Sequence, residues 1–325
     1  MYRSRRLAIM TLPTLDHFTT DLLTYLPAAS GWEIRKFMVT GPSALANALT
    51  WTDDPSRDAM WFEFCWPPFP DIIESTNFGE RRIIMRIHRI EAAETMHVAN
   101  MNWEKIDDVI VVGSDMRQRV VSAAPEIDLV TRVHVLPNGV DIARFGLAPS
   151  WNKFKIGWCG LMTLRKNPIL ALQIFYKLHK IDQNYTMNFC GMGRDPFVFD
   201  IFKYSVEKLG LSDVISWDGN VSQTDMPSWH ADNGVLLHTS IHESFGYAIA
   251  EAACTGCDIA IFDHPGAQST WPSATIFCSV DQAVDMILKA QPGRWRSFVA
   301  DNYSLDQQLN KLSSLLNKIT TTKSL

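Results

Sequence analysis

Short apolar runs alternate with longer amphipathic runs along most of the chain, and this alternation constrains the fold more than any other feature. A short apolar run bounded by turn residues is typical of a buried strand, whereas a longer run with helical periodicity is typical of a helix. Regular alternation of the two predicts parallel strands joined by crossover helices. The sequence therefore predicts an α/β protein.

The alternation runs through the first half of the chain and then restarts. In the first half, the expected strands lie at residues 6–12, 32–39, 58–66, 82–88, 107–114 and 132–140, and the expected helices at 16–26, 42–51, 91–103 and up to 123. In the second half, the expected strands lie at 153–160, 185–191, 214–219, 234–240 and 258–262, and the expected helices at 167–181, 197–210, 225–231, 243–253, 281–290 and 304–319.

We expect two similar domains facing a central cleft, because 325 residues exceed what one hydrophobic core usually supports. The first is placed at residues 1–148 and ends beyond a Pro-Asn-Gly turn, and the second is placed at residues 149–300. Residues 301–325 are a C-terminal helical segment and a candidate for crossing back to the first domain. Ligands of such sheets bind beyond the carboxyl ends of the strands, so the loops there are the candidate sites.

Composition narrows the class of protein. Hydrophobic residues make up 46% and charged residues 20%, which is globular composition. The net charge of −5 argues against a nucleic-acid partner. The basic start "MYRSRR" is either a solubilising end or a weak contact for anionic lipid, so at most peripheral membrane contact is expected. Neither a signal peptide nor a long apolar run is visible, which favours a cytoplasmic location.

The six cysteines lie mostly in apolar runs, where a thiol behaves as a small hydrophobic group. We therefore expect no disulfides. Cys254 and Cys257 form an isolated C-x-x-C without a second pair or a histidine at a zinc-finger spacing, so a zinc site has little support.

Three loops of the second half carry residues suited to a ligand. Arg165 and Lys166 lie just before a helix, where two cations suit an anion. In "CGMGRD", Gly191 and Gly193 would let the backbone approach a ligand, although such pairs also simply form turns. In "HTSIHESFG", polar residues lead from a strand into a helix N-terminus, which favours phosphate.

Glu243 and Glu251 are eight positions apart in this last segment. If the helix starts near Ser244, Glu251 lies about two turns into it, roughly 12 Å along the axis from Glu243. A nucleotide sugar laid along the helix start would fit this length. The alternative is ordinary: one glutamate offsets the helix dipole and the other is solvated.

The run "HESFGYAIAEAACTGC" resembles the E-x7-E signature of retaining GT-B glycosyltransferases of the group 1 type, also called family 4. The segments "VLPNGVDIARF", "IGWCGLMTLRKNP" and "VISWDGNVSQTDMPSWHADNGVLLHTSIHESFG" resemble other motifs of this family, in the family's order over residues 133–266. "RIIMRIHRIEA" resembles the segment that carries the family's cleft histidine. The resemblance implies a GT-B fold, with two Rossmann-like domains whose parallel sheets face a central cleft.

Residue roles follow from the resemblance. It implies Glu243, Lys166 and His88 as catalytic residues, with Glu243 on the transferred sugar and Lys166 on the donor diphosphate. It implies further donor contacts by Glu251 at the ribose and by Arg165, Gly160, Gly191, Gly193, Ser244, Phe245 and Gly246. The family's arginine after the first of these glycines is Leu161 here, and Arg165 is the candidate replacement.

The resulting hypothesis is a metal-independent hexosyltransferase that needs no cofactor, uses a nucleotide diphosphate sugar and acts on a glycan or lipid-linked acceptor. Asp16 and His17, in the loop after the first strand, are the candidate acceptor contacts, although Asp16 also suits a helix cap. Two alternatives remain: another GT-B nucleotide-sugar enzyme of the epimerase type, or a binding protein whose catalysis has decayed. The sequence does not specify the base, sugar, acceptor, linkage or oligomeric state.

Overall fold

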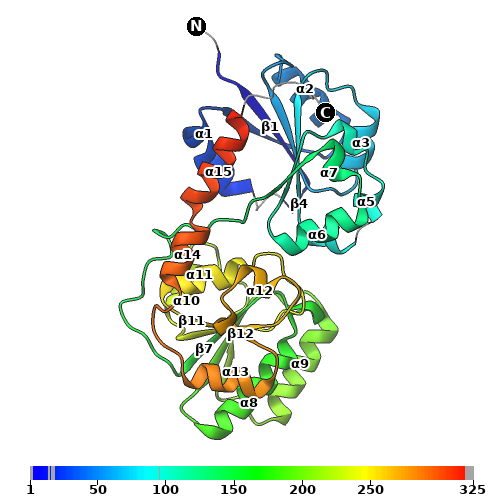
Figure 1. The fold of residues 1–325 in the computed structure, drawn as a ribbon. Helices are drawn as coiled ribbons and strands as arrows, with labels where there is room; N and C mark the ends of the chain where they lie inside the picture. Colours follow the sequence, from blue (N-terminus) through cyan, green and yellow to red (C-terminus); the bar gives the residue numbers. More distant parts are fainter. Residues whose placement is uncertain (1–2, 14, 16–18, 95, 319–325) are drawn as a thin grey trace. The chain divides into compact units, whose positions relative to one another are not determined.

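The computed structural model describes residues 3–13, 15, 19–94 and 96–318 (Figure 1). The chain divides into two compact units. Unit 1 comprises residues 1–137 and 306–325, and unit 2 comprises residues 138–305. The division falls after Pro137, whereas the sequence predicts it after Ala148.

Unit 1 is built on a parallel six-stranded sheet in the order β2-β1-β3-β4-β5-β6. Its strands are β1 (Arg6–Thr11), β2 (Glu33–Met38), β3 (Ala59–Glu63), β4 (Arg82–Ile87), β5 (Asp108–Val111) and β6 (Arg132–Val135). Its helices include α1 (Thr20–Ser30), α2 (Pro42–Trp51), α3 (Phe69–Ser75), α4 (Arg89–Ala93), α5 (Met96–Ala99), α6 (Ser114–Ala123) and α7 (Ile127–Val130). The strands β3, β4 and β5 are buried along their whole length, so polar side chains at their ends are carried by a rigid core.

The single helix expected at residues 91–103 is wrong. The structure has α4, α5 and the 3-10 turn η2 (Trp103–Lys105) instead. After α4, Glu94 leaves helical geometry with ψ 74°. Trp103 is buried and donates its indole N–H to the carbonyl of Val98, a contact that a continuous helix would not allow.

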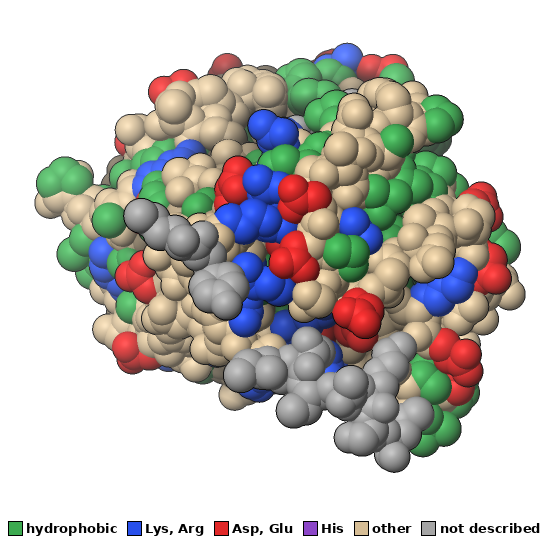
Figure 2. Space-filling model, turned by 90° about the horizontal axis from the view of Figure 1, so that it is seen from above, with side chains coloured by type: hydrophobic (Ala, Val, Ile, Leu, Met, Phe, Trp, Pro, Cys, Tyr) green, Lys and Arg blue, Asp and Glu red, His purple; other side chains and the backbone are tan. Residues whose placement is uncertain are grey.

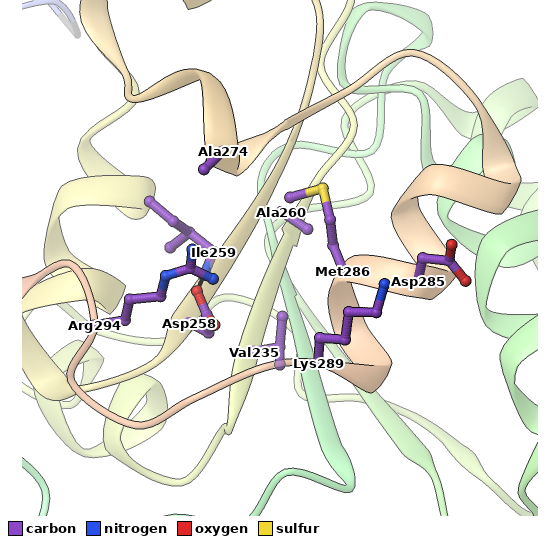
Figure 3. Close-up of a pocket in the computed structure, with 9 residues that line it drawn as sticks. All are labelled: Val235, Asp258, Ile259, Ala260, Ala274, Asp285, Met286, Lys289 and Arg294. Atoms are coloured by element: carbon purple, nitrogen blue, oxygen red, sulfur yellow. Dashed lines mark hydrogen bonds between the residues drawn. The ribbon is translucent and has the colours of Figure 1, made fainter.

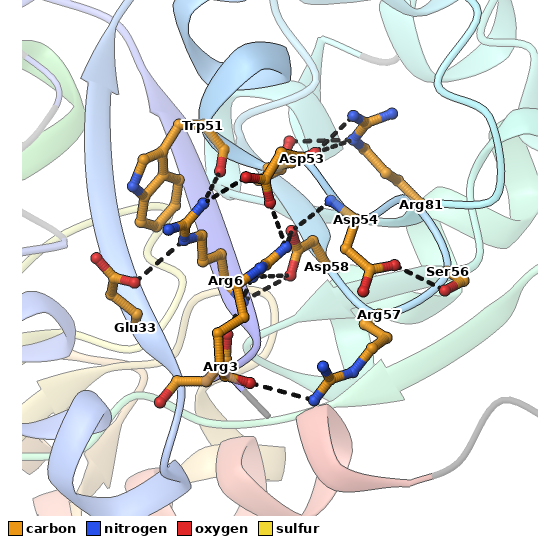
Figure 4. Close-up of polar contacts among 12 residues, drawn as sticks. Arg3, Arg6, Glu33, Trp51, Asp53, Asp54, Ser56, Arg57, Asp58 and Arg81 are labelled. Carbon is orange, nitrogen blue, oxygen red and sulfur yellow. Dashed lines mark hydrogen bonds and ion pairs between the residues drawn. The ribbon is translucent and has the colours of Figure 1, made fainter. Parts of the chain in front are cut away.

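The first arginines are bound into unit 1 (Figure 4). The guanidinium of Arg3 lies 2.7 Å from a carboxylate oxygen of the buried Asp58 and 2.5 Å from Asp53. Arg6 pairs with Glu33 at 3.1 Å and donates to the carbonyl of Trp51. On the face drawn in Figure 2, basic and acidic side chains lie next to one another. This mixture of charge does not form the purely basic surface that anionic lipid prefers.

Unit 2 repeats the arrangement with a parallel six-stranded sheet in the order β12-β11-β10-β7-β8-β9. Its strands are β7 (Lys155–Cys159), β8 (Thr186–Cys190), β9 (Ile215–Trp217), β10 (Val235–His238), β11 (Asp258–Phe262) and β12 (Ile276–Phe277). Its helices include α8 (Pro168–Ile181), α9 (Pro196–Lys208), α10 (Met226–Ala231), α11 (Tyr247–Thr255), α12 (Ala267–Thr270), α13 (Val280–Leu288) and α14 (Arg296–Tyr303). Apolar side chains of α8, α13 and the central strands form one buried cluster beneath this sheet.

The prediction of a turn at Pro-Asn-Gly is also wrong. Residues 136–139 are irregular, and Val140 pairs with Ser304 in a parallel bridge. A Cβ atom on Gly139 would lie 2.6 Å from the backbone of Leu305, so glycine is required for this close approach rather than for a turn.

The last helix, α15 (Leu305–Asn317), packs on unit 1. Asn317 accepts a hydrogen bond from the indole of Trp32, and the carbonyl of Leu315 accepts one from Arg82. In the part of the chain that the structure describes, no helix is both long and apolar enough to cross a membrane.

Candidate active site

The candidate site of unit 2 lies where β7, β8 and β10 end. Glu243 lies in the loop between β10 and α11. The helix begins at Tyr247, and Gly246 precedes it in the left-handed region with φ 80°. The expected start near Ser244 is therefore wrong, because the chain from Glu243 to Gly246 is not helical. Glu251 consequently lies just over one turn into α11, and the separation of about 12 Å, which assumed a continuous helix, does not apply.

Two cations converge on Glu243. The ammonium nitrogen of Lys166 lies 2.5 Å from Oε2 of Glu243, and the guanidinium of Arg165 lies 3.2 Å from the same oxygen. Arg165 also donates to the carbonyl of His242 at 3.0 Å. Both cations come from η3 (Leu164–Lys166), directly before α8, so a short turn of the backbone brings them to the carboxylate.

This environment keeps Glu243 ionised. Burial by itself raises the pKa of Glu243, but Lys166, His238 and Arg165 outweigh burial and hold the pKa well below its usual range. His238 ends β10, and burial lowers its pKa to about 4 despite the nearby carboxylate. The imidazole is therefore neutral at pH 7. Sequence reasoning missed His238, because a single histidine at a strand end gives no distinct signal.

Gly160 packs closely against Gly191 and against the side chain of Lys166. A Cβ atom on Gly191, whose φ is 130°, would lie 1.9 Å from the carbonyl oxygen of Gly160. A Cβ atom on Gly160 would lie 3.1 Å from the side chain of Lys166. A Cβ atom on Gly193 would meet the ring of Phe199 at 3.3 Å. Close packing accounts for these glycines without a ligand, and it leaves room for the stem of Lys166.

Glu251 and Phe245 occupy different surroundings. Oε2 of Glu251 lies 3.5 Å from Nε2 of the fully buried His230 on α10, and the glutamate side chain remains 15% exposed. The side chain of Phe245 is buried against Tyr247 and Trp271. Only the backbone of Phe245 is thus able to meet a ligand, as the resemblance implies.

In unit 1, His88 directly follows β4 and is buried. Its Nε2 lies 2.6 Å from Oε1 of Glu63, which also pairs with Arg86 at 2.5 Å. Sequence reasoning singled out His88 and missed Glu63 and Arg86, because both stand inside runs that look like ordinary strands. The candidate acceptor contacts Asp16 and His17 lie outside the described residues.

One cavity lies away from these residues (Figure 3). It measures about 130 Å³ and is lined by residues that include Val235, Asp258, Lys289 and Arg294. Val235 and Asp258 are the first residues of β10 and β11, so the cavity is at the amino ends of these strands. Drug-sized ligands usually occupy about 300–1,000 Å³. The cavity is both too small and at the wrong edge of the sheet to be the donor site.

All six cysteines are free, and each lies within the described residues. Cys257 donates from its thiol to the carbonyl of Asn233, and burial raises the pKa of Cys254 and of Cys257 to about 12. Such thiols are inert packing groups. Across the described ranges, no group of three or more His, Cys, Asp or Glu side chains is placed to hold a metal ion.

Comparison with known proteins shows a family resemblance in the second half of the chain. Residues 141–275 match the family model described as glycosyl transferases group 1. This segment, which is less than half of the chain, is similar to the group 1 glycosyltransferases. The matched segment contains the convergence of Arg165 and Lys166 on Glu243. No sequence among the curated proteins matches the chain.

Solved structures confirm the fold of the chain. Anabaena HepE in complex with UDP and glucose has a TM-score of 0.76 at 13% identity, over 96% of this chain and 99% of that one. Sucrose-phosphate synthase from Thermosynechococcus elongatus has a TM-score of 0.76 at 12% identity, over 96% and 98%. A glycosyltransferase from Rickettsia africae has a TM-score of 0.73 at 16% identity, over 99% and 100%. The predicted GT-B fold of two Rossmann-like units is confirmed.

Proposed function

We propose that this glycosyltransferase is a retaining, metal-independent enzyme that transfers a hexose from a nucleotide diphosphate sugar to a hydroxyl group of a glycan or lipid-linked acceptor. The observation that carries the proposal is the approach of Lys166 and Arg165 to Glu243, immediately before the N-terminus of α11. Two cations and a helix N-terminus are suited to a diphosphate. A carboxylate beside them is suited to sugar hydroxyls.

The proposed chemistry follows from these charges. Glycosyl transfer breaks the bond between the anomeric carbon and the phosphate oxygen, and negative charge develops on the diphosphate. Lys166 and Arg165 stabilise that charge without a metal ion. The acceptor oxygen bonds to the same face of the anomeric carbon, and its proton goes to the leaving phosphate. Glu243 binds hydroxyls of the sugar, Glu251 binds the ribose, and His88 contacts the reacting sugar or the acceptor.

The position of Arg165 supports full catalytic competence rather than decay to a binding protein. The sequence departs from the family pattern at Leu161, where an arginine is usual. The guanidinium of Arg165 reaches the same carboxylate as Lys166. In the proposed site, Arg165 therefore supplies the second cation. Complexes of Anabaena HepE with UDP and glucose support a nucleotide sugar as the donor class.

The test is incubation with UDP-, ADP- and GDP-hexoses, with release of nucleoside diphosphate as the readout. At least one donor should be hydrolysed slowly, and faster when glycan or lipid-linked acceptors are added. The product anomer should keep the donor's configuration, and EDTA should leave the rate unchanged. Thermal shift measured in parallel separates the alternatives, since a ligand that binds only the folded state stabilises it. Stabilisation by a donor without any turnover would identify a binding protein, and neither effect with any donor would overturn the proposal.

A further inference from the structure

A buried charge cluster in unit 1 surrounds Glu63, the last residue of β3. Oε1 of Glu63 accepts hydrogen bonds from Arg86, at 2.8 Å from Nε and 2.5 Å from Nη2. The same oxygen lies 2.6 Å from Nε2 of His88. Its other oxygen accepts from the indole of Trp61 at 2.7 Å. The four side chains thus converge where β3 and β4 end, which is the ligand-binding edge of a parallel sheet.

The charge state of Glu63 determines the proton on His88. Burial by itself raises the pKa of Glu63, but Arg86 and His88 outweigh burial and bring the pKa to about 2. Glu63 is therefore ionised at any working pH. An ionised carboxylate accepts hydrogen bonds and donates none. The nitrogen that faces it, Nε2 of His88, must consequently carry a proton.

A second contact restrains the same imidazole. The ring of Phe64 stacks on His88 with centroids 4.4 Å apart and an interplanar angle of 30°. Phe64 has φ 107°, a conformation that L-residues rarely adopt. Such strain costs on the order of 1–3 kcal/mol and tends to occur at functional positions. The contact with Glu63 thus restrains the His88 ring in its own plane, and the stacked ring of Phe64 restrains it in the perpendicular direction.

A purely structural ion pair does not account for this arrangement. Arg86 is paired with Glu63 across the two strands in register and already neutralises the carboxylate. Deletion of the imidazole would therefore leave no unpaired charge on Glu63. The carboxylate of Glu63 contacts the imidazole of His88, and Arg86 pairs with the same carboxylate oxygen. Because Arg86 balances Glu63, the effect of Glu63 on His88 is mainly on orientation and tautomer.

We propose that Glu63 is a positioning residue for glycosyl transfer, which holds His88 with its proton on Nε2 and its ring in a single orientation. This inference rests on the part assigned to His88 in the proposed function. Glu63 acts on the reaction only through His88 and has no contact with the substrate.

The first measurement is the tautomer of His88 in the unmodified protein, read from nitrogen-15 chemical shifts of its side chain. We expect a proton on Nε2, and a proton on Nδ1 alone would overturn the inference. This result does not depend on any activity. Failure of the donor panel would refute the proposed function, whereas a wrong tautomer alongside normal transfer would refute only this inference.

The second measurement compares Glu63→Gln with His88→Ala and with the double variant, using Glu74→Gln on the exposed part of α3 as the matched control. Glu63→Gln should lower kcat on the order of 100-fold, with the donor KM within about twofold. The double variant should be no slower than His88→Ala, because both changes act through one group. A double variant whose loss of kcat equals the product of the two single losses would contradict the inference. An unchanged kcat in folded Glu63→Gln would contradict it as well. If Glu63→Gln does not fold, the tautomer of His88 in the unmodified protein still tests the inference.

Discussion

Lys166 approaches Glu243 to 2.5 Å, so the cation that suits the donor diphosphate is already paired with a carboxylate. Arg165 shares the same carboxylate oxygen at 3.2 Å. A diphosphate that enters this site must compete with Glu243 for both cations. If the proposed function holds, Glu243 should therefore weaken the binding of a bare nucleoside diphosphate, while a donor that carries a sugar should regain the lost interaction through its hydroxyls.

This competition predicts opposite effects of Glu243→Gln on two ligands. The amide keeps the size of the side chain and removes its charge. Affinity for the nucleoside diphosphate should rise about tenfold, which corresponds to about 1.4 kcal/mol. The rate of transfer should fall by a factor on the order of 100–1,000, because the sugar loses an ionised partner. Calorimetric titration and steady-state kinetics measure the two effects.

The matched control is Asp232→Asn, which removes a carboxylate paired with Lys155 on the exposed surface of unit 2. It should leave both affinity and rate within about twofold of the unmodified protein. Weaker binding of nucleoside diphosphate by Glu243→Gln would contradict the competition and would show that Glu243 organises the two cations instead.

Arg165 is predicted to replace the family's arginine, which is Leu161 here. Arg165→Leu should raise the dissociation constant for nucleoside diphosphate about tenfold, because one of two charge-assisted contacts is lost. The double variant Arg165→Leu/Leu161→Arg restores the family pattern and should recover most of the affinity. Lys208→Leu, at the exposed end of α9, is the control and should have no effect. No loss of affinity in Arg165→Leu would show that Lys166 acts alone.

The elements that carry the candidate site of unit 2 were largely predictable, because they follow the alternation of strands and helices in one continuous segment. Lys166 and Glu243 come from loops whose positions follow from the strand pattern. The exact helix start was not predictable: Gly246 takes a left-handed φ of 80° just before the helix, and a Cβ atom there would lie 2.7 Å from the side chain of Ile249. The roles of the donor contacts remain predictions.

The charge cluster of unit 1 was not predictable. Glu63 and Arg86 are single charged residues within apolar runs, in strands that are buried along their whole length. In sequence, such residues look like the solvated side of a half-exposed strand. Only the register, which sets Glu63 opposite Arg86, reveals a buried pair. The helix expected at residues 91–103 failed for a related reason, because tertiary packing of Trp103 outweighed helical periodicity.

The buried carboxyl group of Glu91 should make the stability of unit 1 depend on pH. The side chain is buried, one oxygen accepts from the backbone N–H of Cys65, and the other has no hydrogen-bond partner among the described residues. Burial, with a contribution from Glu63, raises the pKa of Glu91 from 4.5 to about 7. The folded protein therefore holds this proton more tightly than the unfolded chain does. The free energy of unfolding should fall as pH rises through this range, from about 4.5 to about 7.

Glu91→Gln should remove this dependence, because the amide resembles the protonated acid and still accepts from Cys65. At pH 8 the variant should be more stable than the unmodified protein, by an amount on the order of 3 kcal/mol. At pH 4.5 the two should be nearly equal. Urea denaturation at both pH values measures the difference, and Glu94→Gln, on an exposed neighbour, is the control. Equal stability at pH 8 would mean that Glu91 ionises in the folded state at its ordinary pKa.

Gly191 and Gly210 form a matched pair that separates backbone strain from steric collision. Both have a positive φ, 130° for Gly191 and 68° for Gly210. A Cβ atom on Gly210 would meet nothing within 4 Å, whereas one on Gly191 would lie 1.9 Å from the carbonyl oxygen of Gly160. Gly210→Ala should therefore lower the free energy of unfolding by about 1 kcal/mol, through strain alone. Gly191→Ala should lower it by more than about 3 kcal/mol, because β7 and β8 must also separate at their ends. Urea denaturation followed by tryptophan fluorescence gives both values, and equal losses would show that the loop of Gly191 moves aside without resistance.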